Sequence, residues 1–185
     1  MGVSGASLGG FLGGIDSSVK SLYMAMYKLF TKDASMTSTN SGPAETIRIG
    51  QLEIQYLQDA GNGCEMGSFV LVVPPGSNVP PPHSHPETEE LVYVLEGTLR
   101  YTVGDVTRDL KAGETMGTPR GSVHAFSNPH GLTARALIVN SPDIGAGYFR
   151  EIAALVRPGG PPDRTKVVEV MRRYGLVPAS PRASG

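Results

Sequence analysis

The sequence predicts an all-β domain of short antiparallel strands, arranged as a sandwich or a barrel. The chain has 185 residues, which is enough for one domain that buries a core without disulfides or a structural metal. Its 24 Gly and 15 Pro favour many turns. From Thr46 to about residue 145, short β-branched or aromatic runs alternate with turn residues, and no helical pattern separates them.

The first 45 residues differ from the rest of the chain. Residues 1–14 are rich in Gly and Ser and predict a loose segment. Apolar residues then recur at steps of three and four from Ile15 to Phe30, which predicts an amphipathic helix. We expect its apolar stripe to cover the main domain or a second subunit. A polar linker follows, and Met36 within it is an alternative start of the protein.

Residues 46–145 supply the strands, and residues 146–185 a helical tail. A two-residue connection, Gly104-Asp105, suits a tight hairpin between two of the strands. Two helices are expected in the tail, at Gly147–Val156 and Asp163–Tyr174. The predicted strands are TIRIGQLEIQYL (46–57), GSFVLVV (67–73), ELVYVLEG (90–97), TLRYTV (98–103), VTRDL (106–110), ETMGTP (114–119), VHAFSN (123–128) and ARALIVN (134–140).

Charge and cysteine content argue against several classes of protein. The chain has 16 basic and 17 acidic residues, so no electrostatic attraction to nucleic acid is expected. Its single cysteine, Cys64, excludes a disulfide framework and fits a reducing compartment. No segment has the length and apolar character of a membrane span or the pattern of a secretory signal. We therefore expect a cytoplasmic protein with no membrane partner.

The segment PPPHSHPETEE, residues 80–90, combines histidines and carboxylates just before an apolar strand. His83 and His85 would share one face of an extended chain, and the prolines place the segment at a rim or an edge. Glu87, Glu89 and Glu90 are alternative candidates for a third ligand. The alternation of side chains between the two faces of the strand does not decide among them. The segment is either a stiff polar loop or part of a metal site.

Two spacings in this chain resemble the two motifs of the cupin superfamily. In G-x5-H-x-H-x3,4-E-x6-G, His83, His85, Glu90 and Gly97 match, and Gly76 lies one residue too far upstream. In G-x5-P-x-G-x2-H-x3-N, Gly113, Pro119, Gly121, His124 and Asn128 match fully. The resemblance covers roughly Gly67 to Asn140, extends to a C-terminal tail like that of small single-domain quercetinase-like cupins, and leaves residues 1–45 uncovered.

The resemblance implies a cupin jelly-roll barrel, a double-stranded β-helix, with a metal bound by His83, His85, Glu90 and His124. Three imidazoles and a carboxylate leave two positions free on a six-coordinate ion, which suits Fe, Mn, Ni or Co, with Zn or Cu as alternatives. The pocket around it is expected to include Phe69, Leu71, Met116 and Phe126. The resemblance also implies a homodimer.

The expected activity is that of a metal-dependent dioxygenase acting on an enol, catechol or flavonol-like small molecule. Glu90 would be its catalytic residue, either remaining a ligand or taking the substrate's proton. One alternative is a metal-dependent isomerase, epimerase or lyase acting on a small sugar or oxo acid. Another is a non-catalytic module that binds a metal or a small ligand.

Overall fold

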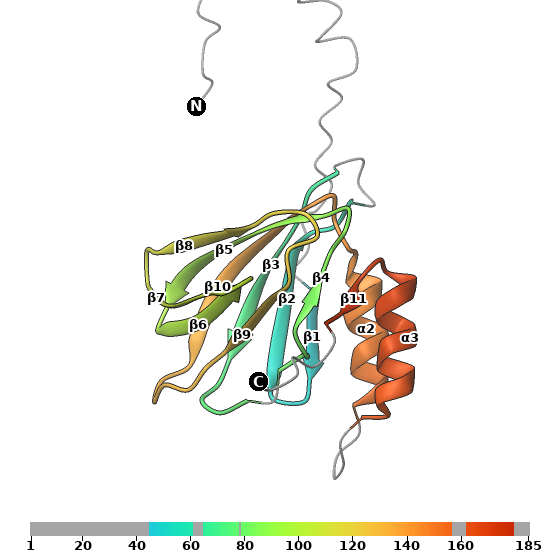
Figure 1. The fold of residues 1–185 in the computed structure, drawn as a ribbon. Coiled ribbons are helices and arrows are strands. Elements are labelled where there is room, and N and C mark those ends of the chain that lie inside the picture. Colours follow the sequence, from blue (N-terminus) through green and yellow to red (C-terminus); the bar gives the residue numbers. More distant parts are fainter. Residues whose placement is uncertain (1–44, 61–64, 78, 157–161, 180–185) are drawn as a thin grey trace, which may run out of the picture. The chain divides into compact units, whose positions relative to one another are not determined.

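The structure, a computed structural model, describes residues 45–60, 65–77, 79–156 and 162–179, and these form two antiparallel sheets and two helices (Figure 1). One sheet has the strand order β1 (Glu45–Ile49), β2 (Leu52–Gln58), β3 (Gly67–Val73), β10 (Ala134–Ser141), β5 (Glu89–Glu96), β8 (Thr115–Thr118). The other has the order β11 (Val177–Pro178), β4 (His83–Ser84), β9 (His124–Ser127), β6 (Thr98–Val103), β7 (Val106–Lys111). The mostly-β prediction is confirmed.

Two glycines form the tight turns that connect neighbouring strands. Gly104 has φ 57° and joins β6 to β7, so the predicted hairpin is present. Gly50 has φ 59° and joins β1 to β2. Because this left-handed conformation breaks an extended chain, the run predicted as one strand at 46–57 is divided into two. The short strands β4 and β11 were not predicted, since two-residue strands carry no periodicity.

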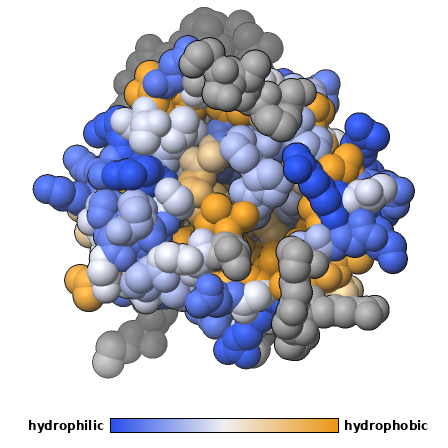
Figure 2. All heavy atoms as spheres, turned by 60° about the horizontal axis from the view of Figure 1, so that its bottom comes forward, coloured by the Kyte–Doolittle hydropathy of each residue, from blue (hydrophilic) through white to orange (hydrophobic). Residues whose placement is uncertain are grey.

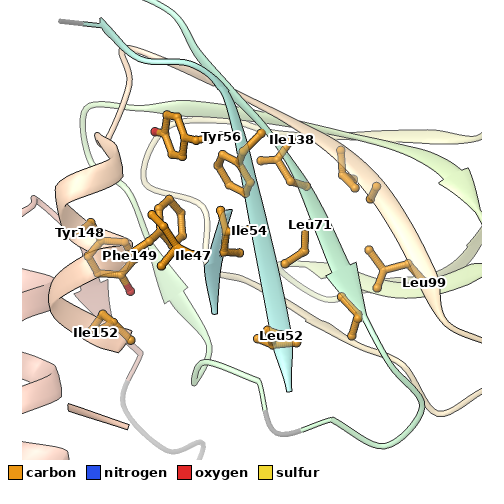
Figure 3. Packing of buried hydrophobic residues seen from close by; sticks show 14 of the residues in the cluster. Ile47, Leu52, Ile54, Tyr56, Leu71, Leu99, Ile138, Tyr148, Phe149 and Ile152 are labelled. Atoms are coloured by element: carbon orange, nitrogen blue, oxygen red, sulfur yellow. The ribbon is translucent and has the colours of Figure 1, made fainter. Parts of the chain in front are cut away.

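The core lies between the inner faces of the two sheets. Alternate residues of β2 and β10 are buried, as the period of two requires. The fully buried side chains from the two sheets include Val92, Val94, Leu99, Tyr101 and Leu110. Three side chains of helix α2 (Ala146–Leu155) extend this core past β1 and β2, where Figure 3 shows Tyr148, Phe149 and Ile152 beside Ile47 and Ile54.

The two C-terminal helices confirm the predicted tail. Helix α3 (Arg164–Arg173) begins after Asp163, whose side chain accepts hydrogen bonds from the backbone N–H groups of Thr165 and Lys166. Helix α2 packs against α3 and against β1. Arg150 on α2 donates to Glu45 on β1, with Nε and Oε1 2.8 Å apart. Neither helix of this part of the chain has the length and apolar character needed to cross a membrane.

The sheets differ from the predicted barrel in one respect. Within the described residues, no strand pairing joins one sheet to the other, so the barrel is not closed by hydrogen bonds. The edge strand β1 is in contact with helix α2. The predicted helix Ile15–Phe30, the rest of residues 1–44, and Cys64 lie outside the described residues.

Candidate metal centre

Strand pairing brings the two motifs together. His83 on β4 lies directly opposite His124 on β9, and their ring centroids are 4.5 Å apart. The rings are oriented by the backbone: His83 Nδ1 lies 2.9 Å from the Pro81 carbonyl oxygen, and His124 Nδ1 lies 3.2 Å from that of Ser122. A proton on each Nδ1 satisfies these contacts and leaves Nε2 as a free lone pair, which is the usual state of a metal-binding histidine.

His85 completes a group of three buried imidazoles. Its ring centroid lies 5.0 Å from those of His83 and His124, and one ligand atom from each residue lies within 4.8 Å of the others. Neither ring nitrogen of His85 has a hydrogen-bond partner, although both are buried. A buried polar group normally has a partner, so the unsatisfied nitrogens fit a ligand position for a metal ion.

Of the three competing carboxylates, only Glu90 lies beside this group. Glu90 Oε1 is 3.7 Å from His124 Nε2, and the side chain is 11% exposed. Glu89 is 65% exposed and its Oε1 is 3.8 Å from Arg120 Nε, while Glu87 is exposed. The compact group contains the three histidines, and Glu90 stands at its edge, next to His124. These residues fit a divalent transition metal with three nitrogen ligands and one oxygen ligand.

Burial keeps the imidazoles neutral. It lowers the pKa of His83 to about 4 and that of His85 to about 3, with a further contribution from neighbouring histidines. The pKa of His124 is also lowered, mainly by burial. Burial raises the pKa of Glu90, and the hydrogen bond from Tyr101 partly opposes this. Neutral imidazole is the form that binds a metal, so the histidines need not release protons to do so.

The histidines form one wall of an apolar cavity between the sheets. It encloses about 640 Å³ including its open mouth. Phe69, Leu71 and Phe126 line it as expected, whereas Met116 packs against the hydrophobic core and is not among the lining residues. Figure 2 shows hydrophobic residues gathered in a hollow of one face, with hydrophilic residues around it. The other described lining residues are Ile49, Leu52, Ile54, Pro80, Glu90, Tyr101, Ile138, Ile144, Tyr148, Phe149, Ile152 and Leu176.

Two polar residues near Glu90 were not singled out in the sequence. The Tyr101 hydroxyl lies 2.7 Å from Glu90 Oε1 and 2.9 Å from Thr118 Oγ1. Asn140 lies opposite Glu90 in the β10–β5 pair, is 0% exposed, and has no hydrogen-bond partner for either amide atom. A polar residue at an inward position of an apolar strand is the signal that could have identified both.

Comparison with known proteins agrees with this geometry. Residues 69–140 match the family model described as Cupin domain. Germin-like protein 1-1 from Oryza sativa subsp. japonica is 38% identical over 97 residues, covering 48% of this chain and 42% of that protein. Protein SchB from Streptomyces halstedii is 33% identical over 81 residues, covering 41% of this chain and 58% of that protein. The match thus spans only part of each relative.

Parts of the chain also align with solved structures. A predicted oxalate decarboxylase from Thermotoga maritima aligns with TM-score 0.49 and 23% identity, covering 56% of this chain and 95% of that chain. A sugar phosphate isomerase from Silicibacter pomeroyi aligns with TM-score 0.46 and 23% identity, covering 51% of this chain and 62% of that chain. Residues 69–140 thus match a cupin domain, and both sequence motifs lie within this segment.

Proposed function

We propose that this protein is a metal-dependent dioxygenase of the quercetinase-like type. Its substrate would be a small molecule with two adjacent oxygens on an apolar body, such as an enol, a catechol or a flavonol. The polarity of the cavity supports this proposal most directly. Three histidines and Glu90 face one end, the remaining walls are apolar, and no Lys or Arg is among the described lining residues.

His83 and His124 would hold one divalent transition metal through Nε2 and His85 through one of its ring nitrogens, with Glu90 as the fourth ligand. Fe, Mn, Ni or Co suits this mixture of imidazole and carboxylate, and Zn or Cu is an alternative. The bound metal would supply a Lewis-acidic centre that holds two adjacent substrate oxygens and stabilises their anion. Imidazoles kept neutral by burial bind the metal without first releasing a proton.

Glu90 is the proposed catalytic residue. Its carboxylate is buried beside the histidines, and burial raises its pKa, so it is suited to accept the proton that leaves the substrate hydroxyl. Phe69, Leu71 and Phe126 would hold the apolar body of the substrate and exclude water from the reacting end. In the overall reaction O₂ oxidises the substrate and both of its oxygen atoms enter the product.

An isomerase, epimerase or lyase acting on a small sugar or oxo acid is the second candidate, and a non-catalytic binding module is the third. Sugars and oxo acids carry many hydroxyl or anionic groups, which need polar and cationic partners in a buried site. The described walls of this cavity offer few such groups beyond the histidine end. This contrast is why we place the dioxygenase first.

The test is to measure O₂ consumption by the metal-loaded protein with a panel of enols, catechols and flavonols. We expect uptake that requires both metal and substrate and that is absent from a His83→Ala/His124→Ala variant. Turnover of sugars or oxo acids without O₂ would favour the second candidate instead. Thermal stabilisation by a ligand with no product under either condition would favour the binding module.

We also propose a cytoplasmic homodimer that does not bind nucleic acid. Leu91, Tyr93 and Leu95 lie on the outer face of β5, where each is about 40% exposed, so they offer an apolar surface for a second copy. Light scattering of the purified protein would give its mass in solution. A Leu91→Lys/Tyr93→Lys variant is expected to shift that mass to the monomer.

A further inference from the structure

We infer that Tyr101 is a positioning residue for Glu90, and this inference rests on the metal centre of the proposed function. Tyr101 is 1% exposed, and its hydroxyl lies 2.7 Å from Glu90 Oε1. It reaches Glu90 from the opposite sheet: Tyr101 belongs to β6, whereas Glu90 belongs to β5. The hydrogen bond therefore crosses the interior of the domain at the end where the histidines gather.

The available protons determine which atom donates in the hydrogen bond between Tyr101 and Glu90. A phenol hydroxyl has one proton, and an ionised carboxylate can only accept, so Tyr101 donates its proton to Glu90. Thr118 Oγ1, 2.9 Å from the same hydroxyl, must then donate to the Tyr101 oxygen. Thr118 and Glu90 are register partners in the β8–β5 pair, so both ends of this chain of hydrogen bonds are attached to one sheet.

The consequence concerns the orientation of the carboxylate. Glu90 Oε1 is held by the phenol and lies 3.7 Å from His124 Nε2, so the hydrogen bond keeps the carboxylate turned toward the histidines. A hydrogen bond to a charged acceptor is stronger than one between neutral groups. Without the hydrogen bond from Tyr101, the carboxylate of Glu90 could adopt other rotamers, and binding of a metal would then have to order this side chain.

Tyr56 provides a matched comparison within the same chain. It is also buried, at 4% exposed, and its hydroxyl donates to a carboxylate, that of Asp143, at 2.5 Å. Tyr56 is not among the residues that line the cavity, and Asp143 is not part of the histidine group. If the hydrogen bond between a buried tyrosine and a carboxylate only stabilised the fold, loss of the Tyr56 hydroxyl and loss of the Tyr101 hydroxyl would therefore change the metal affinity equally.

The experiment compares Tyr101→Phe with Tyr56→Phe, each stripped of metal and titrated with Co(II) by calorimetry and visible absorption. Partners of metal ligands typically contribute about 10–100-fold to affinity. We expect Tyr101→Phe to lose affinity in that range and to change the Co(II) spectrum, while Tyr56→Phe keeps both wild-type values. Thr118→Val, which removes the donor to Tyr101 and keeps its side-chain shape, is expected to lose affinity in the same direction but less.

Wild-type affinity and spectrum in Tyr101→Phe and in Thr118→Val would overturn the role of Tyr101 and leave the metal centre intact. Equal losses in the two tyrosine variants would overturn it as well, because they indicate a structural effect. Should Tyr101→Phe fail to fold, as judged by circular dichroism without metal, the Thr118→Val result decides. A wild-type chain that binds no Co(II) would overturn the metal centre and this role with it.

Discussion

His83 and His124, 41 residues apart in the sequence, are register partners across the β4–β9 pair, with ring centroids 4.5 Å apart. With His85 they form a group of imidazoles that burial keeps neutral. Three rings this close cannot all carry a positive charge without strong mutual repulsion. Protons and metal ions therefore compete for the same atoms, and acid should affect both the stability of the fold and its affinity for metal.

The stability of the metal-free protein is expected to fall as the pH drops below about 6.5. The pKa of His83 is about 4 and that of His85 about 3 in the folded chain, against an ordinary value of 6.5. Between these values the unfolded chain takes up protons that the folded chain cannot, so stability is present above pH 6.5 and is lost toward pH 4. Each unit of difference between the pKa values of a histidine in the folded and unfolded chain contributes about 1.4 kcal/mol to the free energy of unfolding.

Urea unfolding at pH 8, 7, 6 and 5, with a chelator present, measures this dependence. A His85→Gln variant is the control. The raised pKa of Glu90 makes its effect on stability opposite to that of the histidines, but this effect is present in both proteins and cancels in their comparison. We expect a shallower loss between pH 7 and pH 5 in the variant. Identical slopes would mean that His85 can be protonated in the folded chain.

Glu90→Gln should weaken metal binding far more than Glu89→Gln. Glu90 lies beside His124 with an 11% exposed side chain, whereas Glu89 is 65% exposed near Arg120. We expect a loss of at least about tenfold for the first variant, typical of a ligand or its close partner, and almost none for the second. Calorimetric titration with Mn(II) gives both values. Similar losses would show that the wrong carboxylate was assigned.

Two buried asparagines are expected to respond differently to replacement by leucine. Asn128 donates to the Val73 and Leu132 carbonyl oxygens and accepts from the His130 N–H group. Asn128→Leu removes these bonds and should cost about 2–4 kcal/mol of unfolding free energy. Asn140 has no partner, so Asn140→Leu should be neutral or stabilising by about 1 kcal/mol.

Chemical denaturation of the metal-free proteins measures both changes. A large loss in Asn140→Leu would contradict the prediction and indicate that the Asn140 amide is hydrogen-bonded in solution. The group bonded to the Asn140 amide would then lie next to Glu90, because Asn140 and Glu90 are register partners in the β10–β5 pair.

Phe126→Ala should weaken the binding of an aromatic ligand, whereas Met116→Ala should not. Phe126 lines the cavity, and Met116 lies outside it, packed against the core. Loss of one aromatic contact is worth about 0.5–1.5 kcal/mol, or up to about tenfold in affinity. The thermal shift of the metal-loaded protein with catechol measures the effect. Equal shifts in both variants would place the ligand elsewhere.

The sequence predicts the strands and the ligands for physical reasons that can be named. The period of two locates β6 and β10 because each buries one face. The spacing of His83, His85, Glu90 and His124, through its resemblance to the cupin motifs, predicts a metal centre, but not which contacts would hold the ligands in place. The role of Tyr101 depends on how two sheets face each other, and that distance is set by packing rather than by local pattern.

Strand β11 also bears on the order of events during synthesis. Pro178 is the register partner of His83, and the Ala179 N–H group donates to the Pro82 carbonyl oxygen at 2.9 Å. The strand that carries the first histidine thus gains its outer neighbour only after residues 177–179 have left the ribosome. A nascent chain that has made both motifs still lacks this support. Metal loading should therefore follow translation of the helical tail, and a ribosome-stalled chain ending before Val177 should retain metal poorly.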